Sequence, residues 1–392
     1  MEHPLLQSYG PLEGWHILLF IGFISIGFFA YQVQKATRLV MLGSSDARFD
    51  SWSTRISEFI SGWLFQKKVL RDKVAGTMHV LMFWGFLMLA SDMLDLATAN
   101  AFSGKVLPAI LVGPWNGMVE LGYFMALVGC VSALTRRVVF TPEKLKGKSQ
   151  LEGNVILLLI FTITTTSFMI ESAESPSSFW EPLGYWFSEQ GLSEQTVILS
   201  YWAHMLAISV FLFLIPLSKH MHLVMAVPNV FFHDAGPIAR MRPLATGDDG
   251  KAVPLEDLDI DSFGVSTYNQ YSWRQLIDGW SCTSCARCQD VCPAYASGKG
   301  LNPMQVIHDV RNYANDHAPI LLSGGQPDET ILERITEEAV WACTTCNACV
   351  DVCPLYIEHV PKLTDLRRNA MMETMEYPEV LNTAMGNIES AS

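Results

Sequence analysis

Charged residues are scarce in this chain: Asp, Glu, Lys and Arg make up 17% of its 392 residues, whereas half of the residues are hydrophobic. Basic residues are fewer than acidic ones, with 26 Lys and Arg against 39 Asp and Glu, so the net charge is −13. This deficit excludes a nucleic-acid partner, because phosphate binding needs clustered Lys and Arg. The N-terminus lacks a basic stretch and a small-residue cleavage site, so we expect no cleaved signal peptide.

Cysteine is rare and strongly clustered, which excludes a disulfide framework. Eight of the nine cysteines form two arrays of identical spacing, each followed by Pro: Cys282, Cys285, Cys288 and Cys292, and Cys343, Cys346, Cys349 and Cys353. Structural zinc sites usually use two separate Cys pairs, so zinc is the weaker interpretation. The spacing is that of bacterial two-cluster ferredoxins and favours two [4Fe–4S] clusters.

In such arrays the first three cysteines bind one cluster, and the fourth, redirected by the Pro, reaches the other cluster. We therefore predict one cluster on Cys282, Cys285, Cys288 and Cys353, and a second on Cys343, Cys346, Cys349 and Cys292. Thiolate clusters need a reducing compartment, so the arrays should face the cytoplasm. The ninth cysteine, Cys130, is predicted to be a buried apolar thiol.

The chain contains several long apolar segments that carry few charged residues. Five of them approach the ~20 residues that a ~30 Å hydrocarbon core requires, namely Trp15–Val33, Val74–Ala97, Met118–Leu134, Val155–Ile170 and Tyr201–Leu217. We predict an all-α chain: a five-helix transmembrane bundle over residues 1–233, a Gly- and Pro-rich linker over 234–270, and a mainly helical ferredoxin-like domain over 271–392.

Loop charges orient the predicted spans. Basic residues gather after the first span, for example Lys67, Lys68 and Arg71, and after the third, at Arg136 and Arg137, whereas the other two loops are nearly free of them. The positive-inside rule then places the N-terminus outside and the iron–sulfur domain in the cytoplasm, as a multi-pass protein of the cytoplasmic membrane. This agrees with the redox argument, which used different residues.

Residues 49–70 alternate apolar and basic side chains around Trp52, Ile56 and Phe59. This pattern favours an amphipathic helix at the lipid interface, with a solvated loop as the alternative.

Histidines in or beside the spans are candidate haem ligands, since ionisable residues in a bilayer are functional candidates and a haem iron takes two axial imidazoles. His79 and His222 are both expected near the cytoplasmic face. His222 is 18 residues from His204, which is five helical turns, so a continuous helix would put both on one side. We therefore predict that His79 and His222 bind one haem b.

The other histidines leave alternatives open. His220 points away from His222 on the same count and is more simply an interfacial residue. His204 either lines a quinone site, pairs with His16 on a second haem, or is structural. His308, His317 and His359 are predicted to lie at the surface or behind the cluster ligands.

Several segments resemble known families. The stretch with Gly76-Thr-Met-His79-Val-Leu-Met-Phe-Trp-Gly85 and the cysteine segment with Trp341-Ala-Cys-Thr-Thr-Cys are similar to heterodisulfide-reductase-related iron–sulfur oxidoreductases of the electron-transfer flavoprotein:menaquinone oxidoreductase type. The segment Ile215-Pro-Leu-Ser-Lys-His-Met-His222 resembles the last helix of the nitrate reductase gamma subunit, a dihaem cytochrome b. Two features depart from these families: Leu89 stands where the gamma subunit has a second His, and the chain stops about where the usual cysteine-rich CCG domains would begin. We expect that another subunit carries these domains or that this chain is a truncated or processed form.

The resemblance implies a membrane subunit that relays electrons between a cytoplasmic partner and menaquinone through two [4Fe–4S] clusters and one or two haems b. The implied partners are membrane lipid, menaquinone, and an electron-transfer flavoprotein or a CCG-domain subunit of the heterodisulfide reductase kind. The competing hypotheses are a membrane-bound iron–sulfur redox sensor or scaffold without turnover and, more weakly, a cluster-gated transporter.

Overall fold

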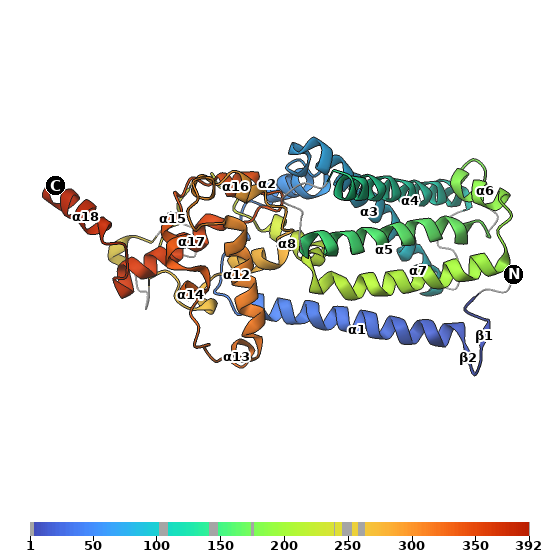
Figure 1. The fold of residues 1–392 in the computed structure, drawn as a ribbon, viewed down its shortest axis with the longest axis horizontal. Helices are drawn as coiled ribbons and strands as arrows, with labels where there is room; N and C mark the ends of the chain where they lie inside the picture. The colour runs from blue at the N-terminus through green and yellow to red at the C-terminus, as the bar shows by residue number, and fades with distance from the viewer. Residues whose placement is uncertain are drawn as a thin grey trace. The chain divides into compact units, whose positions relative to one another are not determined.

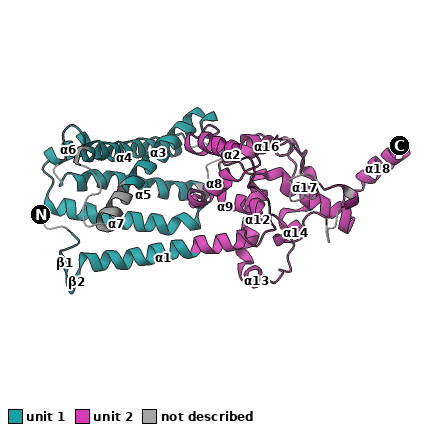
Figure 2. Cartoon of the chain, turned by 180° about the vertical axis from the view of Figure 1, so that it is seen from behind, with its two compact units in different colours: residues 1–31, 69–218 teal, residues 32–68, 219–392 magenta. Residues whose placement is uncertain are grey.

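The computed structural model describes residues 4–101, 109–140, 148–173, 176–238, 240–244, 253–257 and 263–391. These residues are helical nearly throughout, which confirms the all-α class (Figure 1). The strands among them are the two-residue β1 (Ser8–Tyr9) and β2 (Leu12–Glu13), paired antiparallel. By contacts the chain forms two compact units, unit 1 with Met1–Tyr31 and Val69–Ser218, and unit 2 with Gln32–Lys68 and Lys219–Ser392 (Figure 2). The functional boundary near residue 233 stays a prediction.

Unit 1 contains the apolar helices. They are α3 (Lys73–Ala101), α4 (Ala109–Val138), α5 (Lys148–Glu171), α7 (Glu194–Leu214) and the first part of α1 (Gly14–Val40), with the short η2 (Val69–Arg71) and α6 (Pro182–Glu189) between them. Five helices in the described residues are long and apolar enough to cross a membrane, one for each predicted span. The chain is therefore a membrane protein by the length and composition of these helices, and the five individual spans stay a prediction.

Glycines let α3 and α4 pack closely. A Cβ on Gly85 of α3 would lie 2.7 Å from the Gly122 carbonyl oxygen, and one on Gly122 of α4 would lie 2.8 Å from the Met88 Cβ. Further along α4, a Cβ on Gly129 would lie 2.8 Å from the Met78 carbonyl oxygen. Small residues at such spacing bring helix backbones together where lipid supplies no hydrophobic drive, so this contact holds the bundle by van der Waals packing.

The helix expected to carry both His204 and His222 is interrupted. Helix α7 ends at Leu214, and η4 (Ile215–Leu217) leads to Ser218, which is extended with φ −123° and ψ 176°. Then η5 (Lys219–Met221) precedes α8 (His222–Phe231). Pro216 has no N–H for the helix and its ring opposes the preceding turn, which ends the helix here. The prediction that a continuous helix aligns His204 with His222 is therefore wrong.

Unit 2 holds the cysteine arrays among short helices. They are α2 (Trp52–Phe59), the π-helix η1 (Ile60–Leu64), α8, η6 (Leu255–Asp257), η7 (Tyr268–Gln270), α9 (Trp273–Ser281), α10 (Arg287–Asp290), α11 (Pro293–Ala296), α12 (Pro303–Asp316), α13 (Ala318–Leu322), α14 (Ile331–Ile335), α15 (Glu337–Ala342), α16 (Ala348–Val352), α17 (His359–Asn369), η8 (Ala370–Thr374) and α18 (Val380–Ala391). Capping boxes begin α9, at Ser272 with Gln275, and α14, at Thr330 with Glu333.

The core of unit 2 reaches into the segment expected to be a linker. Part of residues 234–270 lies outside the described residues, but Val265 and Tyr268 belong to the same apolar cluster as Tyr271 and Leu276. Residues 49–70, expected to form an interfacial helix, contain α2 and η1. Their position at a lipid surface stays a prediction.

Candidate metal centre

The two cysteine arrays adopt the same local backbone. Ser284 and Ala286 have φ of 56° and 62°, and Thr345 and Asn347, which stand at the same places in the second array, have φ of 55° and 59°. Non-glycine residues rarely adopt this left-handed conformation, and its recurrence marks a functional loop. Such turns aim backbone N–H groups at one point. In the second array the Thr345 N–H donates to the Cys343 sulfur over 3.4 Å.

The fourth cysteine of each array differs from the first three because a proline follows it. Cys292 is followed by α11, with Pro293 in its first turn, where a missing N–H costs nothing. In the second array Cys353 ends α16 in an extended conformation before Pro354. In both arrays the chain therefore leaves the cysteine loop in a new direction directly after the fourth cysteine.

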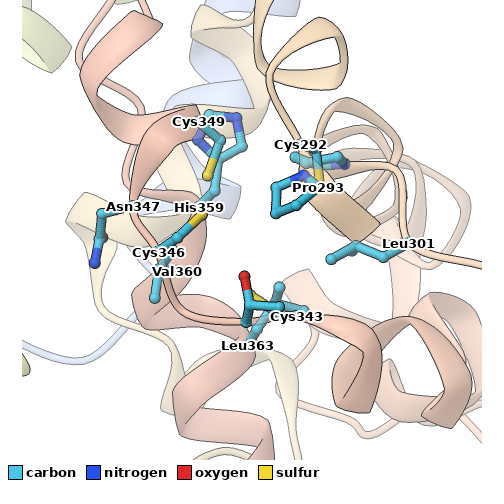
Figure 3. Close-up of a pocket in the computed structure, with 12 residues that line it drawn as sticks. Cys292, Pro293, Leu301, Cys343, Cys346, Asn347, Cys349, His359, Val360 and Leu363 are labelled. Atoms are coloured by element: carbon cyan, nitrogen blue, oxygen red, sulfur yellow. The ribbon is translucent and has the colours of Figure 1, made fainter. Parts of the chain in front are cut away.

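One cavity collects four cysteines from both arrays. Cys292 lines it together with Cys343, Cys346 and Cys349, around about 350 Å³ of space (Figure 3). Leu301, Val360 and Leu363 supply apolar walls, and Cys346 is the exposed member of this group. We call this the outer cavity, because one of its sulfurs reaches the surface of unit 2.

A second cavity collects the other four cysteines. Cys353 lines it together with Cys282, Cys285 and Cys288, around about 310 Å³. Met304, Leu355 and Ile357 contribute apolar walls. Its neighbours are tied to the early part of the chain and to α8: Arg287 donates to the Lys68 carbonyl oxygen over 2.9 Å, and Asn229 donates to the Leu355 carbonyl oxygen over 2.8 Å. We call this the inner cavity.

The chemistry of these cavities fits an iron–sulfur cluster. No three His, Cys, Asp or Glu side chains in the described part of the chain converge closely enough to hold a single metal ion. Burial raises the pKa of Cys282 to about 11 and the pKa of Cys349 and of Cys353 to about 12. These thiols keep their protons at neutral pH unless a metal replaces them, so loading a cluster would release protons.

Histidines predicted to lie behind the ligands occupy three different places. His359 is buried and lines both cavities, with Nδ1–H donating to the Ile357 carbonyl oxygen over 3.1 Å. Burial lowers the pKa of His359 to about 4, so its ring is neutral. His308 lies with Nε2 3.6 Å from the Cys282 sulfur and 3.1 Å from the Ser284 hydroxyl. His317 pairs with Glu329 at 2.8 Å, away from either cavity's lining.

A buried ion network, which sequence patterns do not reveal, locks the inner cavity. Asp278 of α9 accepts from Arg274 over 2.8 Å, from Lys362 of α17, and from the Glu358 N–H over 3.1 Å. None of the side chains of Asp278, Arg274 and Lys362 is exposed. Because α9 leads into Cys282 and residues 354–362 follow Cys353, the network joins the two chain segments whose cysteines share the inner cavity.

The same network continues outward through Glu358. Glu358 accepts from Arg48 over 3.2 Å, from Arg242, and from the Asp234 N–H over 2.9 Å. Attraction to Arg274 and Arg48 outweighs burial and lowers the pKa of Glu358. The carboxylate is thus held ionised between arginines, as a buried charge must be.

The predicted haem histidines are distributed over both units. In unit 1, His79 is half-buried on α3, whereas His16 stacks on Trp15 with 3.6 Å between ring centroids and accepts from the Glu13 N–H. His204 is buried on α7 against α5, with Nδ1 3.1 Å from the Ile163 carbonyl oxygen and 3.0 Å from the Thr166 hydroxyl. In unit 2, the ring centroids of His220 and His222 are 6.0 Å apart. The Nδ1–H of His222 donates to the Lys219 carbonyl oxygen over 2.9 Å.

Comparison with known protein families identifies the region that contains the cysteine arrays. Residues 274–354 match the 4Fe–4S dicluster domain, a region that contains all eight array cysteines. No solved structure matches the chain.

Named relatives extend the similarity beyond this domain. The chain is 28% identical to the EtfAB:quinone oxidoreductase of Syntrophomonas wolfei, over 98% of this chain and 60% of the relative. It is 26% identical to the probable iron-sulfur-binding oxidoreductase FadF of Bacillus subtilis, over 95% of this chain and 58% of the relative. It is 32% identical to a subunit of the ferredoxin:CoB-CoM heterodisulfide reductase of Methanosarcina mazei, over 26% of this chain and 53% of the relative. The chain thus resembles iron–sulfur oxidoreductases, and it spans about three-fifths of the length of the first two.

Proposed function

We propose that the chain is the membrane and iron–sulfur relay subunit of a quinone oxidoreductase, carrying electrons between a cytoplasmic partner and the menaquinone pool. The observation that carries this proposal is the sharing of cysteines: each cavity takes three from one array and the fourth from the other. Two centres that exchange ligands in this way lie close together, as a relay requires. The five apolar helices supply contact with the lipid phase where quinone dissolves.

Each cavity would hold one [4Fe–4S] cluster, which supplies one-electron transfer when bound. Cys282, Cys285, Cys288 and Cys353 are the proposed ligands in the inner cavity, and Cys343, Cys346, Cys349 and Cys292 in the outer. This chain's own contribution is position and electrostatics: the buried network holds the segment after Cys353 against α9, and apolar side chains line both cavities. Exposure of Cys346 favours the outer cavity as the side that faces a soluble partner.

We propose haem b ligation by His79 and His222, with His204 as a ligand of a second haem, partnered by His16, or as part of a quinone site. Support comes from the ring nitrogens of His222 and His204. In both, Nδ1 contacts a backbone carbonyl oxygen, which can only accept, so the proton lies on Nδ1 and Nε2 is left to bind iron. His220 is proposed to be an interfacial residue.

The proposed partner is an electron-transfer flavoprotein or a CCG-domain subunit acting on a thiol/disulfide couple, both in the cytoplasm. The names of two relatives, an EtfAB:quinone oxidoreductase and a heterodisulfide reductase subunit, point to these two partner types.

Purified full-length protein tests the proposal in two steps. Iron and acid-labile sulfide should each approach about eight per chain, as two cubanes require, and a pyridine haemochrome assay should detect haem b. Menaquinol should then reduce the iron–sulfur centres. Clusters that dithionite reduces but menaquinol does not would instead support a sensor or scaffold without turnover.

Variants at the histidines test the haem assignment. His79→Ala should remove the low-spin haem spectrum and leave the electron paramagnetic resonance (EPR) signals of the clusters, because His79 is far in sequence from every array cysteine. His220→Ala should keep most of the haem. The reverse outcome, haem lost in His220→Ala and kept in His222→Ala, would reassign the ligand. His204→Ala distinguishes the two roles of His204. If His204 binds a second haem, the variant should lose half of its haem; if His204 lines a quinone site, the variant should keep all of its haem and bind quinone more weakly.

A further inference from the structure

A buried acid–base pair lies in unit 2 outside both cysteine cavities. His233, at the end of α8, has a side chain that is 7% exposed, and its Nε2 lies 2.6 Å from Oε2 of Glu58 on α2. Its Nδ1 lies 2.7 Å from the Val230 carbonyl oxygen. The Glu58 side chain is 38% exposed. The contact is an ion pair by distance.

This geometry fixes how many protons the pair holds. The Val230 carbonyl oxygen can only accept, so Nδ1 of His233 carries a hydrogen. At 2.6 Å, a lone pair on Nε2 and an ionised Glu58 oxygen would repel each other, so we expect the two groups to hold one proton between them. The pair is therefore either imidazolium with carboxylate or imidazole with carboxylic acid, and it stores one transferable proton.

The groups around His233 act on its charge in opposite directions. Burial lowers the pKa of His233, and the positive charge of Arg274 on α9 adds to this, whereas the Val230 carbonyl oxygen and Glu58 raise it. On α2, Arg55 donates to the His233 carbonyl oxygen over 2.7 Å. Tyr356 packs against the ring with 4.4 Å between centroids.

The pair borders an apolar surface of the same unit. Trp52, Ile56 and Ile60 recur every four residues along α2 and η1 and are exposed. The opposite face, with Arg55, Phe59 and Gly62, is turned inward. This is the two-sided pattern of a helix that lies in a lipid interface. A lipid-soluble molecule that binds along this surface would reach Glu58 and His233.

Two backbone features mark the same place. The helix widens to a π-helix at Ile60–Leu64, a form found mostly at functional sites. Gly62 in that turn meets Tyr356, whose hydroxyl would lie 2.5 Å from a Cβ on Gly62. Tyr356 itself has a left-handed backbone, with φ of 56°. The strain and the missing side chain both serve to bring Tyr356 against α2 and His233.

The pair is also close to the inner cavity along the chain. Tyr356 is three residues after Cys353, so their Cα atoms are at most about 11 Å apart. Leu355, between them, lines the inner cavity. The Tyr356 carbonyl oxygen accepts from Arg274 over 3.0 Å, which ties this segment to the buried network.

We propose that Glu58 and His233 form the proton-transfer pair of a quinone headgroup site on the exposed apolar surface of α2 and η1, next to the inner cavity. The proposal rests on the proposed function, which supplies the two electrons. A quinone fits because it is a lipid-soluble electron acceptor whose oxygens must gain protons as electrons arrive.

In the reducing direction an O–H bond forms at a quinone oxygen while the O–H bond of protonated Glu58 breaks, and the N–H of His233 Nε2 beside it stabilises the carboxylate that is left. Glu58, partly exposed, then takes a new proton from water. Two such transfers and two electrons convert one quinone to quinol. Quinol oxidation runs the same transfers backward and releases two protons through Glu58.

Glu58→Gln and His233→Gln test this in the full-length, cluster-loaded protein held in lipid nanodiscs. Menadiol is the probe, and bleaching of the visible iron–sulfur absorbance measures the rate of electron entry against pH. Loss of positioned proton transfer should slow this rate roughly 100-fold and flatten its pH profile. The double variant should be no slower than either single variant, because the pair acts as a unit. Glu58→Asp, which keeps an ionisable group, should recover part of the rate.

A second His–Glu pair of unit 2 provides the matched control. His317 Nε2 and Glu329 Oε2 are 2.8 Å apart, so His317→Gln and Glu329→Gln make the same chemical changes away from the cavity linings. They should leave the rate and its pH profile unchanged. EPR signals after dithionite reduction should keep wild-type amplitude in all these variants.

The outcomes separate the two proposals. Wild-type protein that dithionite reduces but menadiol does not would overturn the proposed function. If menadiol reduces the wild type and Glu58→Gln equally fast with the same pH profile, the proton-transfer pair is wrong while the relay stands. Loss of cluster signals in Glu58→Gln and in Glu58→Asp would show that the pair is structural, which also overturns it.

Discussion

The fourth cysteine of each array lines the cavity of the other array, although it is nearer in sequence to its own. Cys292 is four residues from Cys288, yet it lies with Cys343, Cys346 and Cys349. The Pro after each fourth cysteine turns the chain away from the loop that holds the first three. A substitution at a fourth cysteine should therefore act across the repeat.

Cys292→Ser tests this directly. The change should disturb the EPR signal of the outer-cavity centre and leave the inner-cavity centre near wild-type, because a hydroxyl is a poor iron ligand and its place is in the outer cavity. Cys353→Ser is the mirror control and should disturb the inner centre. Bleaching of the centre held by Cys282, Cys285 and Cys288 in Cys292→Ser would refute the ligand exchange.

Asp278 balances two buried cations, Arg274 and Lys362. Asp278→Asn keeps the size of the side chain but leaves these cations without their carboxylate, and removing one member of a buried ion group costs about 3–5 kcal/mol. We expect a large loss of thermal stability and early loss of the inner-cavity centre, measured by unfolding and EPR. Asp316→Asn breaks an exposed pair with Arg334 and should cost about 1 kcal/mol or less. Equal effects of the two changes would contradict the role of the network.

At the scale of elements, the α3–α4 contact depends on glycine. Gly122→Ala places a methyl group 2.8 Å from the Met88 Cβ, so the helices must shift apart and lose packing. We expect the free energy of unfolding to fall by about 1–3 kcal/mol, the usual cost of an overpacked contact, and the melting temperature in detergent to fall with it. Gly27→Ala on α1 is the matched control, since nothing lies within 4 Å of its added Cβ. A melting temperature lowered equally by both would attribute the effect to glycine in general.

The break between α7 and α8 changes the direction in which the side chains after it point. With Ser218 extended, residues after it no longer follow the angular count of α7. His222 instead begins a helix that belongs by contacts to the cysteine-bearing unit. Any role of His222 must therefore be argued from α8 and its neighbours rather than from the register of the last span.

At the scale of the whole molecule, basic loop residues predict which ends of the spans face the cytoplasm. A reporter inserted at Gly191, which is exposed between α6 and α7, should be outside, and one fused after α18 should be inside. The physical reason is that Lys and Arg near span ends resist translocation. Accessibility of the reporters in intact cells measures this. The opposite pattern would place the cysteine arrays outside and contradict a cytoplasmic partner.

The sequence by itself was sufficient for features that depend on local periodicity and spacing. Five apolar stretches predicted five long helices, because the length of a span follows from bilayer thickness, and the structure confirms five helices of that length and composition. The cysteine spacing predicted an iron–sulfur domain, and residues 274–354 match a 4Fe–4S dicluster domain. Both signals lie within short windows of the chain.

Only the tertiary structure decided features that join distant residues. The interruption at Pro216 and Ser218 overturned a helical count that assumed continuity, since one residue without an N–H outweighed an otherwise apolar pattern. The pairing of Glu58 with His233, across 175 positions (233 − 58), and of Asp278 with Lys362 has no periodic signal. Such contacts follow from how α2, α8, α9 and α17 pack together, because burial makes an unpaired charge costly and folding selects the partners that neutralise it.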